Sequence, residues 1–308
     1  MPLDQATADF LGKMGEAGFK PFHQCTPEEV RAGLGSLRDM YGAGPAMASV
    51  KEHVADTADG CFGIRVLVPN AQPRAVIVYY HGGGWVFGTP DDFDTLGRRL
   101  AECTGCAVAL VDYRLSPEYH YPAAVDDAYA ALGWVSAHVK DIAGADVPLI
   151  VAGDSAGGTL AAVTALRARD QHGPAIAMQI LIYPVTDASA NSASYAAPEN
   201  QLLLSREDMA WFWDQYLPDT SRRTEPDASP LRANSLAGLP PTLMITAEYD
   251  VTRDDSEAYA TRLEQAGVPV EKIRYAGETH GFFTLLVLPG GDKAMKRIAA
   301  AVARRLDA

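Results

Sequence analysis

The sequence lacks an apolar run long enough to cross a lipid bilayer, and it has no excess of positive charge. No stretch approaches the roughly 18 apolar residues that a membrane-spanning helix needs. There are 26 Lys and Arg against 39 Asp and Glu, which gives a formal charge of −13. Because nucleic acids and anionic membranes are bound through clustered Lys and Arg, we expect neither nucleic-acid binding nor stable membrane association.

We also expect no secretory signal peptide. The first ten residues contain neither a basic segment nor an apolar segment of the kind that such peptides require. We therefore expect a cytoplasmic protein. With 48% hydrophobic and 21% charged residues, the composition is that of an ordinary folded protein.

Cysteines are few, at positions 25, 61, 103 and 106. Four in 308 residues do not make a disulfide framework. Cys103 and Cys106 have the Cys-x-x-Cys spacing of redox and zinc sites, but zinc needs further ligands and the chain has no second such pair. We interpret these two as partly buried thiols and expect no metal site.

What the chain does contain is a series of short apolar runs, each followed by a turn signal and a helical pattern. Near-continuous hydrophobicity is typical of strands buried on both faces, as in a parallel sheet covered by helices. The run at 62–68 alternates more and is predicted to be an outer strand, while 270–275 comes last and is predicted to be an edge strand. The continuous runs lie at 75–80, 107–111, 148–152, 178–183 and 242–247. The alternation predicts a doubly wound α/β fold.

Two segments fall outside this alternation. Near the N-terminus, Thr26 begins a capping box that predicts a helix. Residues 187–227 are too long for a plain loop and contain a second predicted helix, with Ser205 as N-cap ahead of an aromatic run. Two interpretations of this second helix stay open: an ordinary buried helix, or a lid over the carboxyl ends of the strands.

A glycine-flanked serine follows the predicted strand at 148–152. Residues 153–157 read Gly-Asp-Ser-Ala-Gly, the G-x-S-x-G pattern in the strand–turn–helix setting that it requires. A serine on so sharp a turn has a strained backbone, and its hydroxyl is exposed at the N-terminus of a helix. Ser155 is therefore predicted to be a nucleophile, although on this motif alone a plain glycine-rich turn stays open.

Three adjacent glycines follow another predicted strand, between His81 and Trp85. Glycines let the backbone approach a substrate closely, so their N–H groups, together with that of Ala156, are predicted to form an oxyanion hole. The other common use of a glycine-rich loop is phosphate binding. Neither G-x-x-x-x-G-K-[ST] nor a strand-following G-x-G-x-x-G with an acid for the ribose is present, which argues against it.

A serine hydroxyl becomes nucleophilic when a histidine takes its proton. After G-x-S-x-G the expected chain order is serine, acid, histidine. Two histidines follow Ser155; His172 lies where a helix is predicted to end, and His280 comes a few residues after the last predicted strand. We therefore predict His280 as the base.

The acid has four candidates after the strand at 242–247. Asp250 falls in the loop just beyond that strand and is favoured. Asp254 and Asp255 resemble N-cap and first-turn residues of the next helix, and Glu248 is the remaining alternative.

These motifs together resemble those of the hormone-sensitive-lipase-like bacterial carboxylesterases, in the same order and spacing. The matching stretches are His81-Gly-Gly-Gly-Trp85, Asp112-Tyr-Arg-Leu-Ser-Pro-Glu118, residues 121–127, Gly153-Asp-Ser-Ala-Gly-Gly158, Asp250 with Arg253-Asp254, and His280-Gly-Phe282. The resemblance implies a catalytic triad, an oxyanion hole of backbone N–H groups, and a structural histidine that braces the glycine loop. The implied triad is Ser155, Asp250 and His280. The implied oxyanion hole consists of the N–H groups of Gly83, Gly84 and Ala156, and the structural histidine is His81.

The resemblance also implies an architecture. It is an α/β-hydrolase fold with a mostly parallel sheet of about eight strands flanked by helices. Residues 46–186 and 226–308 are expected to form the catalytic domain, and residues 1–45 and 187–225 a helical cap over an acyl-binding pocket. Candidate pocket residues are Trp85, Trp211, Phe282 and Phe283. Relatives of this kind often pair through the edge strand, here Val270 to Tyr275, so a homodimer is a further expectation.

The implied function is hydrolysis of short to medium acyl-chain esters without a cofactor. The nearest alternative is a deacetylase or amidase that uses the same triad. Less favoured are a lyase like the plant hydroxyisoflavanone dehydratases, and a non-catalytic binding protein on a hydrolase scaffold.

Overall fold

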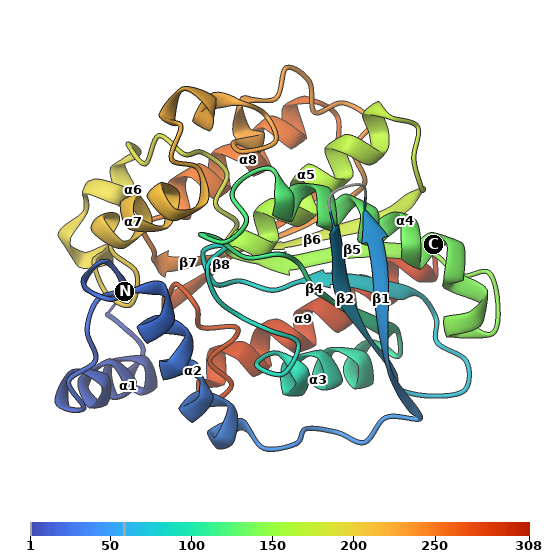
Figure 1. Ribbon diagram of the computed structural model, residues 1–308, viewed down its shortest axis with the longest axis horizontal. Coiled ribbons are helices and arrows are strands. Elements are labelled where there is room, and N and C mark those ends of the chain that lie inside the picture. The colour runs from blue at the N-terminus through green and yellow to red at the C-terminus, as the bar shows by residue number, and fades with distance from the viewer. Residues whose placement is uncertain (1, 58–59) are drawn as a thin grey trace.

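The computed structural model describes residues 2–57 and 60–308, and for residues 34–37 and 39 it describes the backbone alone. Its centre is one sheet of eight strands in the order β1-β2-β4-β3-β5-β6-β7-β8 (Figure 1). The strands are β1 Ser49–Thr57, β2 Gly60–Val68, β3 Val76–Tyr80, β4 Ala107–Asp112, β5 Leu149–Asp154, β6 Ile176–Ile182, β7 Thr242–Tyr249 and β8 Val270–Thr279. The predicted α/β-hydrolase fold with about eight strands is thus confirmed.

Six strands, from β4 to β8 in the sheet order, run parallel, and only the pairs β1–β2 and β2–β4 are antiparallel. The continuous apolar runs explain the central strands. In β3, Val78 and Tyr80 point into one buried cluster while Ile77 and Tyr79 point into the other. Both faces of the strand are therefore covered, so apolar residues occupy consecutive positions.

The strand at one edge of the sheet was not predicted from the sequence. Strand β2 is not the outermost strand at its end, because β1 pairs outside it along its whole length. Strand β1 has the sequence Ser-Val-Lys-Glu-His-Val-Ala-Asp-Thr, of which only Ala55 is fully buried. With so little burial, its residues show no apolar run from which a strand can be predicted.

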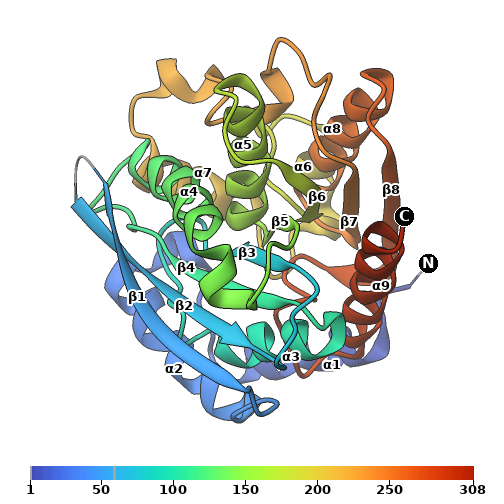
Figure 2. The ribbon, with the colours of Figure 1, turned by 90° about the vertical axis from the view of Figure 1, so that its right-hand side faces the viewer.

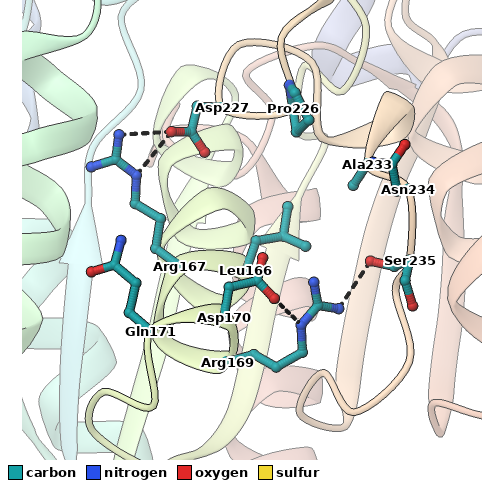
Figure 3. A pocket seen from close by; sticks show the side chains of 10 residues that line it. All are labelled: Leu166, Arg167, Arg169, Asp170, Gln171, Pro226, Asp227, Ala233, Asn234 and Ser235. Atoms are coloured by element: carbon teal, nitrogen blue, oxygen red, sulfur yellow. Dashed lines mark hydrogen bonds and ion pairs between the residues drawn. The ribbon is translucent and has the colours of Figure 1, made fainter.

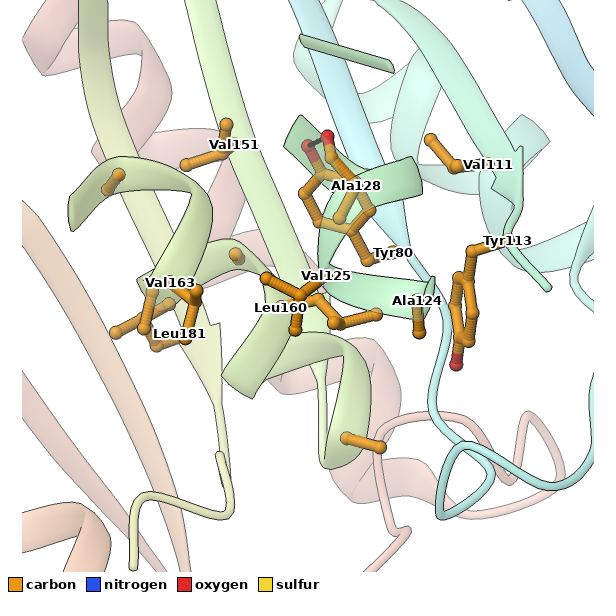
Figure 4. Close-up of a cluster of buried hydrophobic side chains, with 14 of the residues drawn as sticks. Tyr80, Val111, Tyr113, Ala124, Val125, Ala128, Val151, Leu160, Val163 and Leu181 are labelled. Carbon is orange, nitrogen blue, oxygen red and sulfur yellow. Dashed lines mark hydrogen bonds between the residues drawn. The ribbon is translucent and has the colours of Figure 1, made fainter. Parts of the chain in front are cut away.

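Helices cover both faces of the sheet (Figure 2). Helices α4 Ala123–Ala143, α5 Ala156–Asp170 and α8 Arg253–Gln265 pack on one face, and α3 Asp94–Thr104 and α9 Pro289–Leu306 pack on the other. Figure 4 shows part of the first cluster, in which Leu160 and Val163 of α5 lie against Val151 of β5 and Leu181 of β6. The Tyr80 hydroxyl in this cluster donates to the carbonyl of Ala128 at 2.8 Å.

The remaining elements come from two distant parts of the chain. They are α1 Gln5–Glu16, η1 Phe22–Gln24 and α2 Pro27–Tyr41, then α6 Ala193–Ala196, η2 Pro198–Asn200, α7 Arg206–Tyr216, η3 Thr220–Thr224 and η4 Pro230–Arg232. Helices α1, α2, α6 and α7 gather at one end of the molecule (Figure 1). The imidazole Nδ1 and the backbone N–H of His23 both lie within hydrogen-bond distance of Asp208, at 2.7 and 2.9 Å, which joins the two segments.

The local helix signals were read correctly at two starts and incorrectly at a third. Both capping boxes form, Thr26 with Glu29 and Ser205 with Asp208. Asp254 is not an N-cap, since α8 begins at Arg253 and Thr252 precedes it. No helix in residues 2–57 and 60–308 has both the length and the hydrophobicity to span a membrane.

Candidate active site

Ser155 lies on the turn between β5 and α5. Its backbone has φ +52° and ψ −121°, a conformation that a residue with a side chain rarely adopts. The turn is held by a hydrogen bond from the Ser155 N–H to the carbonyl of Ile182 at 2.8 Å. A Cβ atom on Gly157 would overlap the carbonyl oxygen of Tyr80, so the flanking glycine is required for close packing of helix on strand. The turn therefore presents the serine hydroxyl at the helix N-terminus, as predicted.

His280 and Asp250 complete a continuous chain of polar contacts from Ser155. The Nε2 atom of His280 lies 2.8 Å from the Ser155 Oγ, and its Nδ1 atom lies 2.8 Å from the Asp250 Oδ2. The His280 side chain is 9% exposed and the Asp250 side chain is fully buried. The ring of Tyr183 packs at 4.7 Å from the imidazole. Three residues that are far apart in the sequence thus meet in one largely water-excluded site.

Of the four acidic candidates, Asp250 is the one within hydrogen-bond distance of His280. Its second oxygen accepts from the N–H and the hydroxyl of Thr252, at 2.8 and 2.9 Å. These bonds orient the carboxylate toward the imidazole. Two of the other three are engaged elsewhere: Glu248 accepts from the Gly277 N–H, and Asp254 from the Ser194 N–H.

The glycine loop follows β3 and reaches the same site. Gly83 and Gly84 have φ of +117° and +57°, where a side chain is disfavoured. The carbonyl of Gly83 accepts from the N–H groups of Val86 and Phe87, at 2.9 and 3.0 Å. Ala156 is the first residue of α5, so its N–H has no partner within the helix. The Gly82 N–H donates to Asp154, so the loop lies beside the residue that precedes Ser155.

His81 is buried at the start of this loop. Its Nδ1 lies 2.7 Å from the carbonyl of Gly82, and its ring stacks between Tyr113 and Phe93 at 4.4 and 5.0 Å. The Tyr113 hydroxyl donates to the His81 carbonyl at 2.8 Å. Burial lowers the pKa of His81 to about 4, so the ring is neutral at neutral pH.

Asp154 is a site residue that the sequence reasoning missed. Its Oδ1 accepts from the N–H of Gly82 at 2.9 Å and from the hydroxyl of Tyr79 at 2.7 Å. Burial raises the pKa of this carboxyl to about 6, while the Tyr79 hydroxyl and the Gly82 N–H oppose the rise. One signal could have found it. Asp154 ends β5 and the glycine loop follows β3, and because these strands are neighbours, an acid just before Ser155 is expected to lie near the loop.

The four candidate pocket residues lie in different surroundings. Trp85 is fully buried and stacks on Tyr216 at 4.3 Å. Phe282 and Phe283 are fully buried in the cluster between the sheet and α9. Trp211 of α7 retains partial exposure. Their role in lining a substrate pocket stays a prediction.

A cavity of about 600 Å³ lies away from these residues, at the carboxyl end of α5 (Figure 3). Its arginines are already paired: Arg167 donates to Asp227, and Arg169 donates to Asp170 and to the carbonyl of Ser235. Ser155 lies at the opposite end of the same 15-residue helix, which is about 22 Å long. This cavity is therefore separate from the Ser155 site.

Comparisons with known proteins give consistent results. A family model described as the alpha/beta hydrolase fold matches residues 77–284. The chain is 44% identical over 227 residues to the carboxylic ester hydrolase LipN of Mycobacterium tuberculosis, covering 71% of this chain but only 60% of LipN. It is 41% identical over 237 residues to the carboxylesterase NlhH of the same species, covering 76% and 74% of the two chains. Its fold matches a hyperthermophilic esterase from the archaeon Pyrobaculum calidifontis with a TM-score of 0.91 and 37% identity over 98% of each chain.

Proposed function

The chain belongs to the α/β-hydrolase fold family, as its sequence motifs predicted, and from that premise we propose that it is a serine carboxylesterase. The observation that carries the proposal is the contact chain from Ser155 Oγ through His280 to Asp250, with 2.8 Å at each step. A hydroxyl, an imidazole and a buried carboxylate in this order form the arrangement that activates a serine for acyl transfer.

The first step uses both nitrogens of His280. With Nδ1–H donating to Asp250, Nε2 is free to accept the hydroxyl proton as Oγ attacks the ester carbonyl. The buried Asp250 carboxylate holds this tautomer and stabilises the imidazolium that forms. His280 then donates the proton to the leaving alcohol, and the acyl group remains on Ser155.

The tetrahedral intermediate carries a negative oxygen that needs donors in fixed positions. We assign this role to the N–H groups of Gly83, Gly84 and Ala156. Asp154 supports the loop, since its carboxylate accepts a hydrogen bond from the N–H of Gly82, the glycine before Gly83, at 2.9 Å. In the second step a water activated by His280 attacks the acyl group and releases the acid.

The proposal extends to the two helical segments. We propose that residues 1–45 and 187–225 form a cap over the acyl pocket, and that residues 46–186 and 226–308 form the catalytic domain. In support, Phe212 of α7 packs so closely on the glycine loop that a Cβ atom on Gly84 would overlap its ring. A cap in this position favours short to medium acyl chains.

The test is a chain-length series of p-nitrophenyl esters run beside a fluorophosphonate probe. The wild type should hydrolyse the shorter esters, and the probe should add covalently to Ser155. Ser155→Ala should lose both properties, whereas the matched variant Ser189→Ala, on the exposed surface of residues 187–225, should keep them. Ester hydrolysis that survives in Ser155→Ala contradicts the proposal.

The same assay separates the rival activities. Turnover of p-nitroacetanilide at a rate above that of the ester favours an amidase. Dehydration of a hydroxyisoflavanone without ester cleavage favours a lyase. Binding of an ester without release of acid favours a non-catalytic scaffold. Activity should be the same with and without a chelator, since the mechanism needs no metal.

We further propose a homodimer that forms through β8. This strand lies at the end of the sheet and pairs with β7 on one side. The start of the chain covers its far end, where the Asp4 N–H donates to the carbonyl of Gly277 at 2.8 Å, which leaves Val270 to Tyr275 as the open stretch. Light scattering coupled to size exclusion should give twice the monomer mass, and Ile273→Pro should return it to the monomer.

A further inference from the structure

Arg31 connects the N-terminal helix α2 to the glycine loop. Its Nε donates to the carbonyl of Val86 at 2.8 Å, and its Nη2 donates to the carbonyl of Ser116 at 2.9 Å. The two Nη atoms also form a bidentate pair with Glu118, at 2.7 Å each. One guanidinium therefore binds the loop after β3 and the loop after β4 at the same time.

The backbone groups that Arg31 engages are those that set the shape of the loop. The N–H of Ser116 donates to the carbonyl of Trp85 at 2.8 Å, and Val86 and Phe87 donate to the carbonyl of Gly83. The carbonyls of residues 83, 85 and 86 are thus all engaged. The Gly83 carbonyl shares its peptide plane with the Gly84 N–H, so the bonds from Val86 and Phe87 fix the direction of that N–H. The Val86 carbonyl that Arg31 binds shares its plane with the Phe87 N–H, which links Arg31 to the Gly84 N–H through one intervening bond.

Aromatic contacts brace the same loop from the N-terminal segment. Phe22 stacks on Phe87 with ring centroids 5.6 Å apart, and it packs on Phe212 at 5.3 Å. Phe212 in turn contacts Gly84 directly. The segment from Phe22 to Arg31 therefore contacts the loop at Val86 and Phe87, just after its glycines.

We propose that Arg31 is a positioning residue for the oxyanion hole, so that the N-terminal helical segment takes part in catalysis rather than only covering the pocket. The inference rests on the esterase function proposed above. Oxyanion stabilisation depends on donors held in place before the reaction, and Arg31 holds the backbone that fixes one of them, the Gly84 N–H. The hydrogen bonds of Arg31 go to Val86, Ser116 and Glu118 and not to the triad.

The contacts of Arg31 indicate that it positions the loop through its hydrogen bonds to backbone carbonyls, and not chiefly through its ion pair with Glu118. The side chains of Arg31 and Glu118 are 30% and 50% exposed, so their ion pair is screened by water and contributes little to stability. The bonds to the two carbonyls are directional, and a lysine has no planar fork with which to make both. Removing Arg31 should therefore change the geometry of the loop more than the stability of the fold.

The experiment compares Arg31→Ala and Arg31→Lys with Arg38→Ala. Arg38 lies on the same helix, is half exposed and pairs with Asp91 at 3.9 Å, which makes it a matched control. Losing an oxyanion donor lowers kcat by about 100-fold or more. Misplacing a loop that keeps its donors should lower kcat of Arg31→Ala about tenfold, with KM within about twofold of the wild type.

Two readouts distinguish positioning from general damage. A trifluoromethyl ketone forms an oxyanion on Ser155, so its affinity for Arg31→Ala should fall by the same factor as kcat/KM. Added guanidinium ion should restore part of the lost kcat, and Arg31→Lys should lie between the wild type and Arg31→Ala. Arg38→Ala should match the wild type in all of these measurements.

Each contrary result has one meaning. A wild type without esterase activity rejects the proposed function. An active wild type with kcat unchanged in Arg31→Ala, or with kcat lowered but ketone affinity kept, rejects the role of Arg31 alone. If thermal unfolding shows that Arg31→Ala is not folded, Arg31→Lys becomes the deciding variant. A kcat of Arg31→Lys equal to that of the wild type then overturns the inference.

Discussion

The carboxylate of Asp154 accepts a hydrogen bond from the backbone N–H of Gly82 at 2.9 Å, which ties the residue before Ser155 to the first glycine of the facing loop. Both groups are buried, so the bond is not exchanged with water. The turn at Ser155 and the glycine loop are thereby fixed to each other by one oxygen atom, which also accepts a hydrogen bond from the Tyr79 hydroxyl.

Replacing this carboxylate should cost stability as well as activity. Asp154→Ala leaves the Gly82 N–H and the Tyr79 hydroxyl buried without an acceptor, at about 1–3 kcal/mol for each group. Asp154→Asn keeps an oxygen acceptor and should lose much less. Urea unfolding of both variants, with kcat measured in parallel, checks this. Equal losses in the two variants contradict the hydrogen-bond account.

The choice of Asp250 as the acid can be tested against its neighbour Asp254. Asp250→Asn should present an amide to Nδ1 and favour the wrong imidazole tautomer, lowering kcat by about 10⁴. Asp254→Asn should keep most of the activity, because its carboxylate binds the Ser194 N–H and Arg253 instead. Steady-state kinetics at neutral pH measures both. A larger loss in Asp254→Asn would refute the assignment.

Gly84 is expected to tolerate no side chain while Phe212 is present. A methyl group there overlaps the Phe212 ring, so Gly84→Ala should displace the loop or α7 and lower kcat strongly. Truncating the ring makes room, and the remaining strain from a positive φ is about 1 kcal/mol. Gly84→Ala combined with Phe212→Ala should therefore recover activity relative to Gly84→Ala alone. A double mutant no better than the single one would show that the ring is not the obstacle.

Asp255 should make the stability of the fold depend on pH. The residue is 6% exposed, and its Oδ2 has no hydrogen-bond partner among the described residues. Burial is the main cause that raises its pKa to about 7, and Asp187 and Asp254 add to the rise. A raised pKa means that the folded state holds this proton more firmly than the unfolded chain does. Stability from this group is therefore lost as pH rises from about 4 to about 7.

The measurement is the unfolding free energy of Asp255→Asn relative to the wild type at pH 5 and at pH 8. Because the amide does not titrate, the unfolding free energy of the variant relative to that of the wild type should be higher at pH 8 than at pH 5. Asp141→Asn, an exposed carboxylate on α4, should show no such gain and serves as the control. A difference that is the same at both pH values would show that burial of Asp255 does not carry the effect.

The sequence predicted most of the central strands because burial on both faces demands apolar residues at every position, as in β3. It predicted Ser155 because a sharp strand–helix turn requires flanking glycines, and His280 because the order serine, acid, histidine is fixed in this fold. Strand β1 left no such mark, since its residues are mostly solvent-exposed and its pairing with β2 decides its structure.

By itself, then, the sequence predicted the fold class, the turn at Ser155, the glycine loop and His280 as the proposed base, all of which depend on local backbone geometry, on chain order or on burial of consecutive residues. Only the tertiary structure decided which carboxylate faces His280, that Asp154 holds Gly82, and that Arg31 reaches Val86. These contacts join residues 30 to 72 positions apart. Their partners are set by the packing of whole elements, which no single segment encodes.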